Sequence, residues 1–227
     1  MRPAALKWPF NRTNRRVLIQ DRIWFIPEIK EDPEVAQRDI FEFPGWRHSD
    51  LFQNDHPINI EYCSGNGHWI AEKAEQNPLI NWVAIERKFD RVRKIWSKMQ
   101  NRKLSNLLII CGEGHHATNL YIPEKSVGDV FINFPDPWPK TRHHKNRIVQ
   151  HTFVQELRRI MKNESVLTMV TDDEDYSKWM TKVLSTSEGF FDENHTTEWP
   201  TYGRSYFEQL WREQGKTISY HQYMKIR

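Results

Sequence analysis

Cysteine is scarce in this chain of 227 residues: the two present, Cys63 and Cys111, each end an apolar run. Two cysteines so placed form neither a disulfide framework nor a tetrahedral zinc set, which argues against a small cystine-rich secreted fold and a structural zinc site. We expect both thiols to be buried and inert. Their scarcity fits a reducing compartment, so the expected location is cytoplasmic.

Long apolar runs are missing too. No stretch reaches the roughly 18 uncharged apolar residues of a membrane span, and residues 1–16 hold no continuous apolar signal core. The net charge of +3 is too small to indicate a polyanionic partner by itself. We therefore expect no membrane association, and a monomer is the default because the sequence alone identifies no apolar surface.

Metal-ligand spacing is likewise absent. The histidine pairs at 115–116 and 143–144 have no flanking acid or cysteine that completes a known spacing, and adjacent residues do not easily bind one ion. We expect no metal. No serine or cysteine nucleophile motif stands out either.

Short apolar runs alternate with amphipathic stretches from Ile58 onward, the pattern of βαβ units around a parallel sheet. Strands are expected at 58–63, 82–86, 107–111, 127–134, 165–171, 189–199 and 217–226. Helices are expected at 68–76, 88–102, 148–161 and 176–184, with a turn near Ala117 and a polar segment at 207–213. The sequence predicts an α/β, Rossmann-like fold with a mostly parallel seven-stranded sheet and helices on both faces. Residues 1–50 are expected to form an N-terminal arm and residues 51–227 the main domain.

The first predicted strand leads into a glycine loop. Gly65 and Gly67 permit a tight turn and let a ligand approach the backbone at the start of a helix. The third glycine of a dinucleotide fingerprint would fall at position 70, which is Ile70. Its absence disfavours an NAD-dependent oxidoreductase.

Three acids lie at the ends of predicted strands. Glu86 follows Gly65 by 21 residues, close to the spacing of an acid that binds ribose hydroxyls. Glu113 offers an acceptor for an adenine amino group, and Glu61 would repel a pyrophosphate but attract the positive charges of S-adenosylmethionine. The alternative is that these carboxylates only cap helices or solubilise strand ends.

The segment after the fourth strand, FPDPWPK at 134–140, carries three prolines. Each fixes φ and removes an N–H donor, so the segment is neither a helix interior nor a central strand. A stiff loop at a strand's carboxyl end would hold Asp136 and Trp138 in set directions where open α/β sheets bind ligands. Trp138 is expected either to stack on a base or to pack in the core.

A basic run follows at once. Residues 140–147 contain four permanent cations and two histidines, a composition suited to phosphate. We expect Arg142, Lys145 and Arg147 to bind RNA phosphates. The alternative is a solvated charged surface, which the adjoining loop makes less attractive.

Together these motifs resemble the tRNA (guanine-N7)-methyltransferase family of the bacterial single-chain type, over roughly residue 43 to the end. The strongest element is FPDPWPKTRHHKNR at 134–147. It is supported by IEYCSGNG at 60–67, IE at 85–86, TD at 171–172 and SYFE at 205–208.

The resemblance implies methyl transfer from S-adenosylmethionine to guanine N7 in the variable loop of tRNA, at position 46. It implies a cofactor set of Glu61, Gly65, Gly67, Glu86, Glu113 and Asp136, with Asp136 also catalytic. It implies substrate contacts from Lys140, Asp172, Ser205, Tyr206, Phe207 and Glu208.

The sequence departs from the family pattern at three places: Cys63-Ser64 in the glycine loop, Glu113 in place of an aspartate, and Tyr206 in place of a cation. A methyltransferase for another RNA and a non-catalytic tRNA-binding protein remain alternatives.

Overall fold

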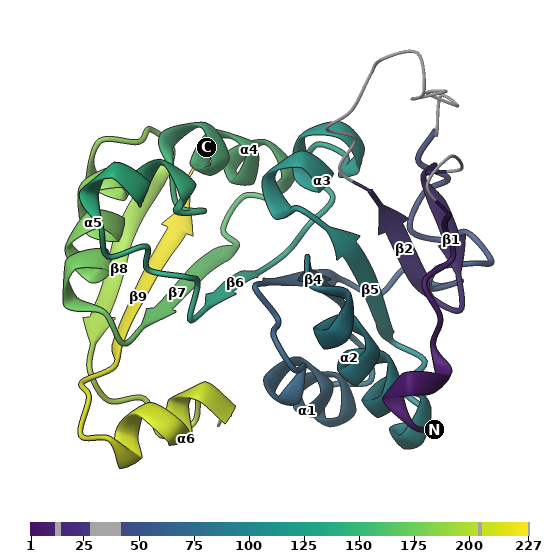
Figure 1. Cartoon of the computed structure of the whole chain (residues 1–227). Coiled ribbons are helices and arrows are strands. Elements are labelled where there is room, and N and C mark those ends of the chain that lie inside the picture. Colours follow the sequence, from purple (N-terminus) through teal and green to yellow (C-terminus); the bar gives the residue numbers. More distant parts are fainter. Residues whose placement is uncertain (12–14, 28–41, 204–205, 227) are drawn as a thin grey trace.

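The computed structural model describes residues 1–11, 15–27, 42–203 and 206–226, and only the backbone of Tyr206. Within these residues one sheet runs in the order β1-β2-β5-β4-β3-β6-β7-β9-β8 (Figure 1). Its strands are β1 (Leu18–Gln20), β2 (Ile23–Ile26), β3 (Ile58–Tyr62), β4 (Asn81–Glu86), β5 (Leu107–Gly112), β6 (Val130–Asn133), β7 (Val166–Thr171), β8 (Phe190–Thr196) and β9 (Ser219–Lys225). The helices are α1 (His68–Gln76), α2 (Phe89–Arg102), α3 (Gly114–Tyr121), α4 (His151–Ile160), α5 (Glu174–Ser185) and α6 (Tyr206–Glu213), with 3-10 turns η1 (Pro3–Ala5) and η2 (Thr141–Asn146).

Burial on both faces explains why the central strands are short apolar runs. Every residue of β3, β4 and β5 is buried. Strands β2 to β7 run parallel, whereas β9 is antiparallel to both β7 and β8. Parallel strands need helical crossovers that cover the sheet, so their residues have no polar face to present. The predicted Rossmann-like α/β class is confirmed.

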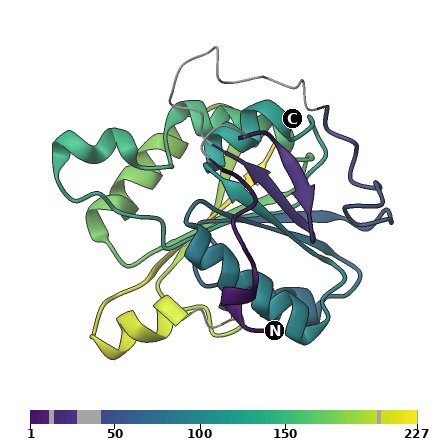
Figure 2. The same cartoon turned by 45° about the vertical axis from the view of Figure 1, so that its right-hand side comes forward.

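Two helical layers cover the sheet (Figures 1 and 2). Helices α1 and α2 pack on one face through residues such as Ile70 and Ile95. Helices α3, α4 and α5 pack on the other, where α4 buries the stripe Phe153, Leu157 and Ile160 that its sequence period indicates. The order of the parallel strands reverses between β3 and β6, which opens a crevice at their carboxyl ends.

The predicted count of seven strands is too low. The seven correspond to β3 to β9, and the expected N-terminal arm adds β1 and β2 at the β5 edge. All four residues of β2 are buried. A strand this short, in a segment rich in proline and arginine, gives no period to detect. The division of the chain into an arm and a main domain at residue 50 stays a prediction. The arm's two strands are part of the same sheet, because β2 pairs with β5.

Two segments expected without helix are helical. The polar segment at 207–213 belongs to α6, and the turn near Ala117 is α3, whose first turn is capped by the Glu113 side chain. Among the described residues, no helix is both long and apolar enough to cross a bilayer.

Candidate active site

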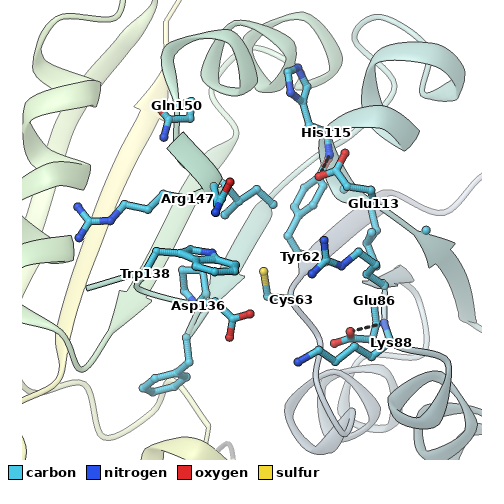
Figure 3. Close-up of a pocket in the computed structure, with 18 of the residues that line it drawn as sticks. Tyr62, Cys63, Glu86, Lys88, Glu113, His115, Asp136, Trp138, Arg147 and Gln150 are labelled. Atoms are coloured by element: carbon cyan, nitrogen blue, oxygen red, sulfur yellow. Dashed lines mark hydrogen bonds between the residues drawn. The ribbon is translucent and has the colours of Figure 1, made fainter. Parts of the chain in front are cut away.

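A pocket of about 590 Å³ lies at the carboxyl ends of β3, β4, β5 and β6, in the crevice where the strand order reverses. Figure 3 shows Asp136 and Trp138 on one side and Glu86 and Glu113 on the other, with Cys63 between them. Three of the four predicted cofactor acids therefore border one cavity large enough for a nucleoside ligand.

Glu86 ties the glycine loop to the tip of β4. Its Oε2 accepts a hydrogen bond from Gly65 N at 2.9 Å, and its Oε1 accepts one from Lys88 N at 2.8 Å. Arg91 lies 3.7 Å from Oε2. A carboxylate has about four acceptor positions, so Glu86 can hold the loop and still accept from a diol.

Glu113 is the N-cap of α3. Its two carboxylate oxygens accept from His115 N at 3.1 Å and His116 N at 2.7 Å. Glu113 therefore caps a helix, which is the alternative role that the sequence allowed for it, and it also lines the pocket. Its backbone-bound carboxylate is held in place for a ligand rather than free to swing toward one.

Glu61 lies apart from the large pocket. It is 2% exposed and borders a separate cavity of about 20 Å³ beside the glycine loop. Asn133 Nδ2 donates to its Oε1 at 2.7 Å. The pKa of Glu61 is raised to about 7, mainly by burial, and the hydrogen bond from Asn133 offsets part of that rise. Ser64 Oγ donates to the backbone carbonyl of Glu61 at 2.9 Å, not to its carboxylate.

Asp136 is exposed at the rim of the pocket on the proline-rich loop. Phe134 and Trp138 both have φ of +47°, a region that bulky side chains rarely adopt. The loop is anchored at two points, by Phe134 N donating to Val170 O and by the Arg147 guanidinium donating to Pro137 O. Backbone strain of this kind persists only where the surroundings hold it, as at ligand sites.

Arg147 holds the loop instead of facing solvent. Only 2% of it is exposed. Its Nε donates to Pro137 O at 2.8 Å, its Nη2 donates to Asp175 Oδ2 at 2.5 Å, and the guanidinium lies over the rings of Tyr176 and Trp179. The prediction that Arg147 binds an RNA phosphate is therefore wrong for this conformation. Arg142 and Lys145, in contrast, are exposed.

The predicted substrate residues do not gather in the large pocket. Lys140 is exposed outside its lining, Asp172 is paired with Lys216 at 2.5 Å, and Glu208 accepts from Tyr220 and Arg212. Phe207 instead packs against the glycine loop: a Cβ built on Gly65 would lie 3.2 Å from its ring. Ser205 and the Tyr206 side chain lie outside the described residues.

Cys63 was expected to be buried and away from any site, and the structure corrects this; Cys111 is buried as expected. Cys63 is partly exposed, lines the pocket and has φ of +60°, a conformation that glycine adopts without strain. Burial and the nearby carboxylates raise the pKa of its thiol, so it stays protonated at neutral pH. One signal for its place at the site is visible in the sequence: Cys63 lies between Glu61 and the glycines of the loop.

Gly67 is fixed by two constraints. Its φ is +68°, and a Cβ there would lie 2.7 Å from Cγ1 of Ile95, a buried residue of α2. Gly67→Ala is expected to reduce the free energy of unfolding by about 2–4 kcal/mol, measured by urea denaturation, because it adds both strain and a clash.

Gly215 provides the matched control for this change. Its φ is +74°, but no atom lies within 4 Å of a built Cβ, so Gly215→Ala should cost only about 1 kcal/mol. Equal losses for the two variants would show that the contact with Ile95 is unimportant.

Comparison with known proteins places this site in a family. A family model described as "Putative methyltransferase" matches residues 55–220. The tRNA (guanine-N(7)-)-methyltransferases of Chlamydia abortus and Chlamydia muridarum are 38% and 40% identical, each covering 99% of this chain and 98% of the relative. A SAM-dependent methyltransferase structure from Aquifex aeolicus has a TM-score of 0.55 at 14% identity, over 76% of this chain and 85% of that one, which supports the fold.

Both relatives are matched over nearly their whole length at 38–40% identity. The chain belongs to the tRNA (guanine-N7)-methyltransferase family.

Proposed function

We propose that this protein transfers a methyl group from S-adenosylmethionine to N7 of a guanine in tRNA, in the variable loop at position 46. The observation that carries the proposal is the pocket at the strand tips, which Glu86 and Glu113 line on one side and Asp136, on the anchored proline-rich loop, lines on the other. Family membership supports the reaction and the substrate. A cytoplasmic location and a monomeric state stay predictions from the sequence.

The residues present fit this cofactor. Glu86, at the tip of β4, would accept the ribose hydroxyls, and Glu113, at the tip of β5, would border the adenine. The buried Oε2 of Glu61 accepts no hydrogen bond from the described residues, so an acceptor remains for the α-ammonium group. When bound, S-adenosylmethionine supplies a methyl group activated by a positively charged sulfur.

Alignment is the main task left to the protein. Guanine N7 carries an in-plane lone pair and no proton, so no strong general base is needed. Holding two reactants in line can contribute about 7–11 kcal/mol. We propose that Asp136 orients the base and stabilises the positive charge that passes to the purine.

Recognition of guanine requires an acceptor for two donors, N1–H and the exocyclic amino group. We keep Asp172 and Glu208 as the proposed carboxylates, together with Lys140 and the segment 205–208 as tRNA contacts. Because both acids are paired within the free protein, binding of the base must compete with Lys216 or with Tyr220 and Arg212. Asp172→Ala tests this role through the rate and selectivity for guanine.

One experiment tests the function as a whole. An unmodified tRNA transcript is incubated with the protein and labelled S-adenosylmethionine, then digested and mapped by mass. A single added methyl on a guanine, located at position 46, is the expected product. Label on a different base, or binding of tRNA without transfer, would contradict the proposal and favour one of the two alternatives.

Lys145 is proposed to contact a tRNA phosphate, since it is exposed and borders the pocket. Lys145→Ala is expected to weaken tRNA binding and to lower the slope of log Kd against log salt by about one, the value for one lost phosphate contact. Lys162→Ala, an exposed lysine after α4, is the control and should leave the slope unchanged. An unaltered slope in Lys145→Ala would remove this residue from the RNA contact surface.

A further inference from the structure

The small cavity beside the glycine loop has the size and lining of an ammonium site. Its volume of about 20 Å³ is roughly the room needed for one water-sized group. Glu61 borders it together with the aromatic residues Trp69, Phe134 and Phe207. A carboxylate combined with aromatic rings favours a cation over a neutral or anionic group.

One hydrogen-bond chain holds the Glu61 carboxylate. Asn133 Nδ2 donates to Glu61 Oε1 at 2.7 Å, and the Tyr202 hydroxyl donates to Asn133 Oδ1 at 2.6 Å. All three residues are buried. Because Tyr202 engages Oδ1, the amide cannot rotate without losing both bonds, and its N–H stays directed at Glu61.

Tyr202 is itself fixed on the sheet-facing side of α1. Trp69 Nε1 donates to the Tyr202 carbonyl at 3.0 Å, and the two rings stack with centroids 5.2 Å apart. Burial and the nearby Glu61 raise the pKa of Tyr202 well above its usual value, so its hydroxyl remains a donor. Both hydrogen bonds therefore donate in the same direction, from Tyr202 to Asn133 and from Asn133 to Glu61.

The second carboxylate oxygen is left open. Glu61 Oε2 is buried and has no hydrogen-bond partner within the described residues. A buried acceptor without a partner costs free energy, which a donor entering the cavity would recover.

We propose that Tyr202 and Asn133 are positioning residues for the cofactor: they hold Glu61 so that Oε2 receives the α-ammonium group of S-adenosylmethionine. This proposal rests on the proposed function. It assigns a role to Tyr202, on the segment that leads into α6, and so connects that segment to the cofactor cleft.

The surroundings of Glu61 give this role a pH signature. The pKa of Glu61 is raised to about 7: burial and the Glu86 carboxylate at the tip of β4 raise it, and the hydrogen bond from Asn133 lowers it. Two further titratable groups line the same cavity, His68 at the start of α1 and the Cys63 thiol, which itself lies near Asp136 and Arg91. An ammonium group favours the ionised carboxylate, so binding releases a proton below about pH 7, and affinity falls as pH drops.

The test uses S-adenosylhomocysteine, which keeps the ammonium group but lacks the sulfonium charge. Its Kd is measured by calorimetry on the full chain from pH 5.5 to 8.5, an interval of about 1.5 units either side of the expected midpoint, in buffers of different ionisation enthalpy to count protons released. Neither tRNA nor turnover is needed. Tyr202→Phe removes one hydroxyl. Tyr223→Phe is the matched control, because it removes a buried hydroxyl that contacts His195 instead.

For the wild type we expect tighter binding up to about pH 7 and proton release below it. Tyr202→Phe should weaken binding about tenfold at neutral pH and shift the midpoint to higher pH, because the freed amide no longer supports the charged carboxylate. Asn133→Ala should do the same more strongly, and Tyr223→Phe should match the wild type.

Three results would overturn the positioning role or the cofactor assignment. An unchanged midpoint and Kd in Tyr202→Phe, with the wild type binding normally, would end the positioning role and leave the proposed function intact. A wild type that fails to bind S-adenosylhomocysteine at every pH would instead overturn the cofactor assignment. A uniform loss of affinity with no shift in midpoint would mark Tyr202 as merely structural.

Discussion

Asp136→Asn is expected to lower kcat for methyl transfer by about 10²–10³-fold, the usual cost of losing one preorganised charge at a reacting centre. The substitution keeps the shape of the side chain and removes its charge. Since Asp136 is exposed on a loop anchored at Phe134 and Pro137, the fold should not change. Single-turnover kinetics with tRNA and saturating cofactor measure the effect.

Two controls make this result specific. Asp90→Asn removes another exposed carboxylate, in the first turn of α2, and should leave kcat unchanged. The Kd of Asp136→Asn for S-adenosylhomocysteine separates cofactor binding from catalysis. A variant with normal kcat would show that the charge of Asp136 does not act on the reacting atoms.

Arg147→Met is expected to lower both stability and kcat. The buried guanidinium donates to Pro137 O and Asp175 and lies over two aromatic rings, so its loss should cost about 2–3 kcal/mol of unfolding free energy. Without the bond to Pro137 the loop that carries Asp136 is less well held, and misplacement by about 1 Å can reduce a rate 10²-fold. Denaturant unfolding and kcat are the measurements.

The salt dependence of tRNA binding separates this role from phosphate contact. Arg147→Met should keep the wild-type slope, whereas Lys145→Ala should lower it without changing stability. Arg147→Lys should recover little, because an ammonium group lacks the planar fork and the ring stacking. A reduced slope in Arg147→Met would restore the phosphate role inferred from the sequence.

The strand-end acids were the most predictable part of the site. The interval of 21 residues from Gly65 to Glu86 predicted an acid at the end of the second strand that binds ribose hydroxyls. The structure places Glu86 at the tip of β4, where it accepts a 2.9 Å hydrogen bond from Gly65 N, and its role toward a ribose stays a prediction. Parallel strands bring their carboxyl ends to one edge of the sheet, so an acid that ends such a strand lies near the crevice where ligands bind.

Arg147 was misassigned because sequence gives the type of a side chain but not its direction. Within one run of cations, Arg142 and Lys145 face solvent while Arg147 is buried against α5. The reason is a partner 28 residues later, Asp175, together with Tyr176 and Trp179 on the same helix. No local pattern in residues 140–147 carries that information.

Helix α6 and the hydrogen bonds that run from Tyr202 through Asn133 to Glu61 were not predicted, for a related reason. The segment at 207–213 is polar by composition, and its place is set by tertiary contacts such as that of Phe207 with the glycine loop. Tyr202 meets Asn133 across 69 residues. Contacts at such distances depend on the whole topology, which one sequence does not disclose.

The position of β2 has a consequence during synthesis on the ribosome. Ile23 pairs with Ile109, so a strand made early waits for 86 further residues before its neighbour exists. At about 5–20 residues per second that delay is on the order of 4–17 seconds. Throughout it, the apolar sequence Ile-Trp-Phe-Ile at 23–26 can pair only with β1 and has no parallel strand beside it. The nascent chain thus offers a hydrophobic segment to chaperones well before the enzyme is complete.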